Sequence, residues 1–250
     1  MRTVVVIPAR LASSRLPNKV LLDLAGKSVL QRVYEQAMQA EGIDAVYIAT
    51  DSIEIQHACQ PFTDNILMTA STHQSGTDRI AEAIGQISCN VVVNVQGDEP
   101  FIDPTLISAV AHALIQHNAP MSSAMKRINS IQDLQNPNCV KVVVNQQQQA
   151  LYFSRSPIPY DRDILLEESI KNYSYYRHIG IYGYTKTFLQ QYSQMPMSPL
   201  EQREKLEQLR VLEHGFRIQM VETQESSLGI DTAEDYQKAL EKIKEQHASY

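Results

Sequence analysis

Three cations stand close together in the segment that follows the first apolar run of the chain. Arg10, Arg15 and Lys19 come directly after the run Thr3–Ile7. Guanidinium and ammonium groups, with exposed backbone N–H groups at the end of a strand, can surround a polyphosphate. The segment has no glycine, so it is not a dinucleotide fingerprint, and Leu21 stands where a Walker motif would need glycine. A solvated basic loop is the alternative interpretation.

Two carboxylates follow later apolar runs. Asp98 comes shortly after the run Val91–Val95, and Asp231 follows a short apolar pair near the carboxyl end. Mg²⁺ takes one or two carboxylates together with substrate phosphates, so either residue suits a cation beside a polyphosphate. Asp98 can equally be a turn residue. For Asp231 the local sequence favours the N-cap of the last helix, with Glu234 three residues on.

Two further groups of polar residues could bind a ligand. Ser75, Gly76 and Arg79 open a helix-like segment, where they can hydrogen-bond a base or ribose or simply cap the helix. The second group lies in segments 152–155, 177–182 and 207–210, which offer arginine, histidine, tyrosine and glutamine side chains. This mixture suits a small acidic polyol, although each such residue alone is more often structural.

The elements that would position these residues alternate between strand and helix through the first half of the chain. Short runs rich in β-branched residues predict strands, and apolar residues at helical spacing predict helices. The strands are expected at Thr3–Ile7, Ala45–Thr50, Asn65–Met68 and Val91–Val95, and the helices at Ser28–Ala40, Asp78–Ile87 and Pro104–Ile115. This order predicts an α/β fold with a Rossmann-like, mostly parallel sheet sandwiched by helices, whose ligands lie at the carboxyl ends of the strands.

The second half has a different pattern. It predicts strands at Cys139–Asn145 and Ala150–Ser154 joined as a hairpin, a strand at His178–Tyr184, an irregular dimer-facing or mobile segment at 160–176, a helix at Pro199–Glu213, a strand at Arg217–Glu222 and a last helix from Thr232. We expect a single domain over residues 1–245, with an inserted mixed-strand subdomain for sugar binding and dimerisation around 125–190. Residues 246–250 are expected to fray.

Composition excludes several classes of protein. The 250 residues carry a net charge of −6, which gives no global reason to bind nucleic acid or an anionic membrane. No apolar stretch is long enough to span a membrane, and the first run is too short for a signal peptide, so a cytoplasmic protein is expected. Cys59, Cys89 and Cys139 match neither a disulfide framework nor a metal pair, and we expect them to be reduced, buried and structural.

The motifs taken together resemble one family. In chain order they are IPARLASSRLPNK, ATD, HQSGTDR, VNVQGDEP, NPNCVKVV, ALYFSRSPIPYDRD, RHIGIYGY, EKLEQLRVLEHG and GIDTAEDY. The order resembles the 3-deoxy-manno-octulosonate cytidylyltransferases, also called CMP-Kdo synthetases, from about residue 3 to residue 240. The family has a nucleotide-diphospho-sugar transferase-like fold.

The resemblance implies an activity and a set of site residues. The activity is Mg²⁺-dependent transfer of a cytidylyl group from CTP to 3-deoxy-manno-octulosonate (Kdo), which activates Kdo for lipopolysaccharide synthesis, in a homodimer. CTP contacts are implied at Ala9, Arg10, Arg15, Lys19, Ser75, Gly76 and Arg79. Sugar contacts are implied at Gln96, Arg155, His178, Tyr182 and Gln208. Asp98 and Asp231 would hold the metal, against the local preference for Asp231 as a cap, and the catalytic set would be Arg10, Lys19, Asp98 and Asp231.

The chain also departs from the family pattern. Asn18 stands in place of a usual glycine, and Asn tolerates the left-handed backbone better than most residues. Tyr160 stands in place of tryptophan, and Ser226–Leu228 precedes Gly229 where relatives are richer in Gly and Thr. The alternatives are a cytidylyltransferase for an 8-amino Kdo analogue or for sialic acid, and a catalytically silent nucleotide-binding module.

Overall fold

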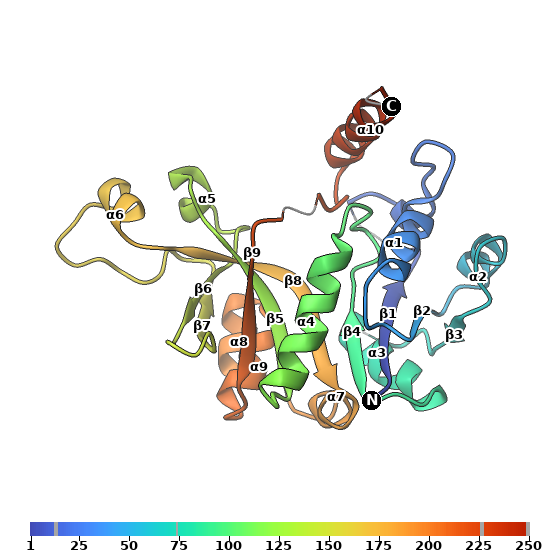
Figure 1. The fold of residues 1–250 in the computed structure, drawn as a ribbon, viewed down its shortest axis with the longest axis horizontal. Helices are drawn as coiled ribbons and strands as arrows, with labels where there is room; N and C mark the ends of the chain where they lie inside the picture. The colour runs from blue at the N-terminus through green and yellow to red at the C-terminus, as the bar shows by residue number, and fades with distance from the viewer. Residues whose placement is uncertain (13–14, 74, 226–227, 249–250) are drawn as a thin grey trace. The chain divides into compact units, whose positions relative to one another are not determined.

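The computed structural model describes residues 1–12, 15–73, 75–225 and 228–248 of the chain (Figure 1). The fold divides into two compact units. The first comprises Met1–Ser108 with Ser226–Tyr250, and the second comprises Ala109–Glu225. The second unit contains the segment 125–190 that we expected as an inserted subdomain and extends beyond it at both ends. The single domain over 1–245 stays a prediction.

Four parallel strands form the sheet of the first unit. In spatial order they are β3 (Ile66–Met68), β2 (Ala45–Thr50), β1 (Thr3–Ala9) and β4 (Val91–Asn94). Every residue of β4 and all but Pro8 of β1 are buried. Strands buried on both faces are continuous apolar runs, which is why composition alone located these strands. The predicted parallel sheet is confirmed.

Serine residues begin three of the helices of this unit. Ser28, Ser52 and Ser75 each accept a hydrogen bond from the N–H three residues on, which satisfies a donor at the helix start. The helices are α1 (Val29–Met38), α2 (Ile53–Cys59), α3 (Gly76–Ala83) and α10 (Ala233–Ala248), with 3₁₀ turns η1 (Lys19–Leu21) and η2 (Ile84–Gln86), and α4 (Pro104–Gln116) runs on into the second unit. Helix α2 was not predicted. Of the expected frayed tail, residues 249–250 lie outside the described residues.

The second unit contains antiparallel as well as parallel pairs. Strand β5 (Met121–Arg127) lies between β8 (Tyr176–Thr185), to which it is antiparallel, and β9 (Ile218–Thr223), to which it is parallel. Strands β6 (Lys141–Val144) and β7 (Ala150–Ser154) form the predicted hairpin.

Strand β5 was missed from the sequence because serines stand in its buried core. Ser122 and Ser123 are both fully buried. Each hydroxyl donates to a backbone carbonyl, Ser122 Oγ to Val110 O at 2.7 Å and Ser123 Oγ to Ile181 O at 2.8 Å. Because these bonds satisfy the hydroxyl groups, the strand needs no apolar run to stay buried.

Two predictions for this unit were wrong in part. The expected helix over 199–213 is two helices, α8 (Pro199–Glu204) and α9 (Gln208–Glu213), because Lys205 takes the left-handed conformation with φ of 54°. The segment 160–176 is not wholly irregular, since it contains α6 (Leu166–Asn172), which packs with α5 (Ile131–Gln135) (Figure 1). The remaining helix, α7 (Lys186–Tyr192), follows β8.

The structure describes all three cysteines and also shows whether any described helix could cross a membrane. All three cysteines are free, but only Cys59 and Cys89 are buried, so the expectation that Cys139 is buried was wrong. Burial raises the pKa of Cys59 to about 12, which keeps that thiol protonated. Among the described residues, no helix combines the length and the apolar character that crossing a membrane requires.

Candidate active site

The loop after β1 presents the cationic segment at the carboxyl end of the sheet's strand. Arg10 is exposed directly after β1, and Lys19 begins the turn η1. Between them Asn18 takes the left-handed conformation with φ of 54°, and its N–H donates to Leu11 O at 3.3 Å. Asn18 thus fills the conformational role of the glycine that it replaces.

Asp98 reaches the same region because Gly97 packs tightly on the end of β1. A Cβ atom on Gly97 would lie 3.0 Å from the backbone oxygen of Pro8. Only glycine fits so close to a carbonyl oxygen without displacing it. The turn after β4 therefore depends on Gly97 to bring Asp98 beside the loop of Arg10 and Lys19.

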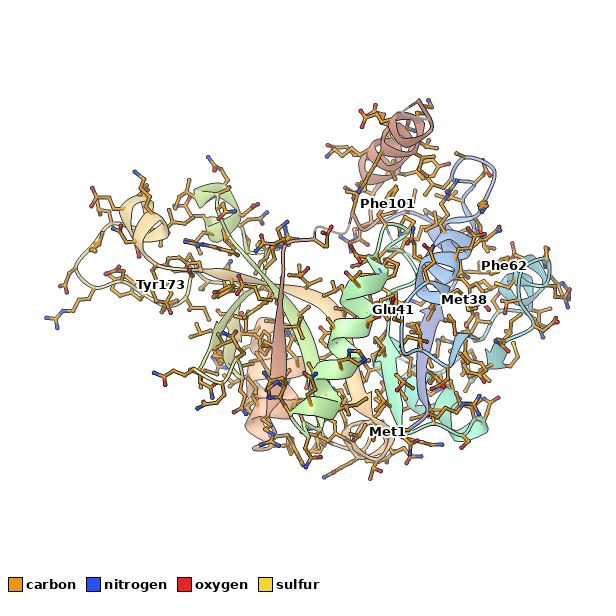
Figure 2. The ribbon with its side chains drawn as sticks, in the orientation of Figure 1. Met1, Met38, Glu41, Phe62, Phe101 and Tyr173 are labelled. Atoms are coloured by element: carbon orange, nitrogen blue, oxygen red, sulfur yellow. The ribbon has the colours of Figure 1, made fainter. Side chains whose placement is uncertain are left out.

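Asp231 is brought to Asp98 by the packing that anchors α10. Ile230 is fully buried in a cluster with Leu24 and Val29, and its N–H donates to Asp98 O at 2.8 Å. Phe101, labelled in Figure 2, packs against the same cluster, and Lys242 Nζ lies 4.4 Å from the centre of its ring. Backbone and apolar contacts thus fix the position of the residue that follows Ile230.

The expectation that Asp231 caps the last helix was wrong by one residue. Thr232 is the cap, because its Oγ1 accepts from the N–H of Asp235 at 3.2 Å. The carboxylate of Asp235 in turn accepts from the N–H of Thr232 at 3.0 Å, so the two residues cap the helix reciprocally. The carboxylate of Asp231 is thereby left to face the cationic loop.

Lys19 lies between the two carboxylates. Its Nζ donates to Asp98 Oδ2 and to Asp231 Oδ1, the second at 2.7 Å. Arg15 Nη2 lies 3.0 Å from the other oxygen of Asp231. Burial alone would lower the pKa of Lys19, but the hydrogen bonds to Asp231 and Asp98 outweigh burial and raise it. Lys19 is therefore charged at neutral pH, and the four side chains form one alternating ionic cluster.

The carboxylate pair also has the chemistry of a Mg²⁺ site. Mg²⁺ prefers oxygen ligands and is usually held by one or two carboxylates plus substrate phosphates and water. Because Asp98 and Asp231 both reach one nitrogen atom, they can both reach one cation. Within the described ranges, no three His, Cys, Asp or Glu side chains are grouped to hold a metal. The remaining ligands would therefore come from phosphate and water.

The start of α3 lies beside the same strand end. A Cβ on Gly76 would lie 3.3 Å from Pro8 Cγ, so α3 begins against the residue that Gly97 also contacts. Ser75 Oγ accepts from the N–H of Asp78 at 3.1 Å and is the helix cap. Ala9 is the buried last residue of β1. Gly76 is exposed, so a ligand can approach the start of α3.

Arg79 has structural partners that the sequence did not reveal. The side chain is buried, its Nη1 donates to Thr69 Oγ1 at 2.7 Å, and it forms an ion pair with Asp51 at 3.3 Å. Asp51 was not among the predicted site residues, although it ends the ATD motif. The pair orients Arg79 from two neighbouring strand ends, because Asp51 follows β2 and Thr69 follows β3.

Three of the residues expected to bind sugar meet in the second unit. His178 Nδ1 lies 3.5 Å from Gln208 Nε2, and His178 Nε2 lies 2.8 Å from Ser123 Oγ. The rings of His178 and Tyr182 are 5.4 Å apart. Burial lowers the pKa of His178 to about 3, so the ring is neutral at neutral pH. Since the Gln208 amide donates to Nδ1, the ring proton belongs on Nε2, which donates to Ser123. Of the other two residues expected to bind sugar, Gln96 belongs to the first unit and Arg155 to the second.

Arg155 is held by backbone carbonyls of its own unit. Its Nε donates to Glu204 O at 2.7 Å, Nη1 to Pro137 O at 3.0 Å and Nη2 to Lys205 O at 3.4 Å. Buried Lys141 donates from Nζ to Arg155 O at 2.5 Å, and its burial lowers its pKa. The guanidinium still has N–H groups on its terminal nitrogens for a further acceptor. The sequence analysis did not identify the role of Lys141 in holding Arg155, although the NPNCVKVV motif places this lysine in an apolar run.

Arg210 lies in the candidate segment 207–210, and its side chain is held by a structural ion pair. Its Nε and Nη2 lie 2.7 Å and 2.5 Å from the two carboxylate oxygens of Glu201. Its guanidinium also lies 5.1 Å from the centre of the Tyr192 ring. This bidentate pair leaves Arg155 as the better candidate for a substrate carboxylate. Ser226 and Ser227, which depart from the family pattern, lie outside the described residues.

Comparisons with known proteins show what this chain is similar to. Residues 4–245 match the family model described as cytidylyltransferase. The 3-deoxy-manno-octulosonate cytidylyltransferase of Geobacter sulfurreducens is 44% identical, over 98% of this chain and 100% of that protein. The one of Pseudoalteromonas translucida is 45% identical, over 99% of this chain and 100% of that protein.

Solved structures give the same result. The structure of CMP:2-keto-3-deoxy-manno-octonic acid synthetase complexed with CTP superposes with a TM-score of 0.92 at 40% identity, over 98% of this chain and 100% of that chain. A nucleotidyl transferase from Methanothermobacter thermautotroptrophicus superposes with a TM-score of 0.64 at 14% identity, over 98% of this chain and 99% of that one, and shows the fold alone.

Proposed function

The chain belongs to the 3-deoxy-manno-octulosonate cytidylyltransferase family, and we propose that its cluster of Arg15, Lys19, Asp98 and Asp231 transfers the cytidylyl group of CTP to Kdo. The reaction forms CMP-Kdo and pyrophosphate. The observation that carries the proposal is the convergence of two carboxylates and two cations at the end of β1.

The chemistry explains why cations are needed there. The anomeric hydroxyl of Kdo must attack an α-phosphorus that is surrounded by negative oxygens, and Kdo brings its own carboxylate. Arg10, Arg15 and Lys19 would bind the triphosphate oxygens and offset this repulsion, and Arg10 and Lys19 would stabilise the charge on the departing pyrophosphate. The attack is in line and needs no covalent enzyme intermediate, so positioning and electrostatics supply most of the rate.

Asp98 and Asp231 would hold Mg²⁺. Bound there, Mg²⁺ would screen the triphosphate and lower the pKa of the attacking hydroxyl. The protein supplies the rigid placement of both carboxylates, because Gly97 packs on Pro8 and Ile230 is anchored in the core.

Nucleoside recognition would come from the start of α3. The backbone at Ala9, with Ser75 and Gly76, would contact cytidine, and Arg79 would donate to it from a side chain that Asp51 holds in place. The N–H groups at the start of a helix are a suitable donor set for a negative or carbonyl oxygen.

The sugar acid would be bound by Gln96, Arg155, His178, Tyr182 and Gln208. Neutral His178 has one long contact, to Gln208 at 3.5 Å, which a sugar hydroxyl can replace. Arg155 would bind the Kdo carboxylate with the N–H groups that its carbonyl partners leave over. A planar guanidinium suits a carboxylate because the two can form paired hydrogen bonds.

A homodimer and a cytoplasmic location complete the proposal. The second unit exposes large apolar side chains, among them Leu151, Leu165 and Tyr173, the last labelled in Figure 2. Tyr160, which replaces the usual tryptophan, is 86% exposed. Leu165 and Tyr173 lie in the segment 160–176 that we expected to face a dimer partner, and apolar patches on a surface are typical of interaction sites. Sedimentation should give twice the mass of 28.2 kDa, and a monomer at every concentration would exclude the dimer. The cytoplasm is the compartment that supplies CTP.

One assay tests the reaction and its acceptor. Pyrophosphate release from CTP in Mg²⁺ is measured with Kdo, its 8-amino analogue and sialic acid in parallel. We expect release with Kdo. Preferential release with either of the other acids would correct the acceptor, and no release with any of the three would favour a silent nucleotide-binding module.

A further inference from the structure

The ammonium group of Lys19 occupies the space that a shared cation of Asp98 and Asp231 would need. Lys19 Nζ donates to one oxygen of each carboxylate, and its side chain is only 14% exposed. We propose that Lys19 blocks divalent cations from this pair until a nucleotide draws the lysine away. The inference rests on the proposed function and adds to it an order of binding, in which the cation site forms only with the triphosphate.

The charges of the free site favour this order. Asp98 and Asp231 carry two negative charges, and Lys19 and Arg15 carry two positive charges in direct contact with them. A divalent cation approaching the free protein therefore meets a neutral cluster. To bind both carboxylates it must break two charged hydrogen bonds of Lys19, which are stronger than neutral ones.

The triphosphate changes the balance because it offers Lys19 other acceptors. When Lys19 and Arg15 turn to phosphate oxygens, the negative charges of the two carboxylates are no longer neutralised by these cations. The phosphates also supply oxygen ligands of the kind that Mg²⁺ requires. By linkage, whatever factor the nucleotide adds to cation affinity, the cation adds to nucleotide affinity.

Lys19, rather than Arg15, is the blocking residue. Arg15 contacts only Asp231, and its side chain is 65% exposed. Lys19 contacts both carboxylates and is largely buried between them. Removing Arg15 would leave the shared space filled, whereas shortening or neutralising Lys19 would open it.

The test measures Mn²⁺ binding without nucleotide, by titration calorimetry or by the electron paramagnetic resonance of free Mn²⁺. Lys19→Met should bind Mn²⁺ at least tenfold more tightly than the wild type. The matched control is Lys27→Met, which also removes a paired lysine of this unit, at 2.7 Å from Glu35, and should match the wild type. The double variant Lys19→Met/Asp231→Asn should bind Mn²⁺ no more tightly than the wild type. A Lys19→Met affinity within twofold of the wild type would overturn the proposal.

A second variant guards against misfolding. If Lys19→Met does not fold, the thermal midpoint of Lys19→Gln with and without Mn²⁺ replaces the titration, and a midpoint that Mn²⁺ raises no more than in the wild type overturns the proposal. Since neither measurement needs turnover, the block by Lys19 and the proposed cytidylyl transfer are tested separately. A wild type that makes CMP-Kdo while Lys19→Met gains no affinity would leave the function standing without the block.

Discussion

A single methyl group added at Gly97 should move the turn that carries Asp98 away from the end of β1. A Cβ there would lie 3.0 Å from Pro8 O, whereas ordinary van der Waals contact begins at 3.4 Å, so alanine must move the Asp98 turn and the end of β1 apart by about 0.4 Å. Such overpacking costs about 1–3 kcal/mol of the free energy of unfolding. At about 2–4 °C per kcal/mol for a chain of this size, the thermal midpoint should fall by about 2–12 °C.

The same shift should weaken catalysis. If a displacement of about 1 Å costs roughly 100-fold in rate, a displacement of about 0.4 Å should lower kcat/KM about 5- to 10-fold. Thermal unfolding and pyrophosphate release are measured on Gly97→Ala and on the matched control Gly85→Ala, where a Cβ meets nothing within 4 Å. The control should behave as the wild type. A Gly97→Ala protein as stable and active as Gly85→Ala would refute the argument that Gly97 sets the position of Asp98.

Three further predictions concern a cap, an ion pair and a histidine. Ser75→Ala and its control Ser52→Ala should each lower the free energy of unfolding by about 1 kcal/mol, because both serines cap helices. Only Ser75→Ala should raise the KM for CTP. Equal KM values for the two variants would exclude nucleotide contact by Ser75. Arg210→Met should lower the free energy of unfolding, measured in urea, by about 3–5 kcal/mol, because it leaves the buried Glu201 carboxylate without its cation. A loss under about 1 kcal/mol would contradict a stabilising role for this ion pair. The pKa of His178 is about 3 in the folded chain and about 6.5 when unfolded, so the unfolded chain takes up the proton first as the pH falls. Stability should therefore be full above about pH 6.5 and decline toward pH 3 by at most about 1.4 kcal/mol per pH unit. His178→Asn should flatten this decline, and an unchanged pH profile would count against the neutral ring.

The sequence predicted the elements whose signal is local. Strands β1 and β4 are apolar because both faces are buried, and four of the six residues of β2 are buried too, so composition alone located these strands. The left-handed Asn18 agreed with the conformational preference of its type. In contrast, Lys205 takes the left-handed conformation without any preference for it, which is why the break between α8 and α9 was missed.

The contacts that the sequence could not predict are those between distant residues. Lys19 and Asp231 are 212 positions apart, and the packing of Ile230 beside Asp98 helps to bring them together. Local sequence made Asp231 a cap because the true reciprocal pair, Thr232 and Asp235, lies one residue further along. Motif order grouped the site residues, but it could not show which of them already have structural partners.

The most direct test of the central claim is pyrophosphate release by Asp98→Asn in Mg²⁺ with CTP and Kdo. Asp64→Asn, which removes an exposed carboxylate elsewhere in the first unit, is the control, and circular dichroism confirms that both variants fold. We predict that Asp98→Asn folds but releases no measurable pyrophosphate, while Asp64→Asn matches the wild type. Near-normal release by a folded Asp98→Asn protein would contradict the assignment of the cluster as the active site.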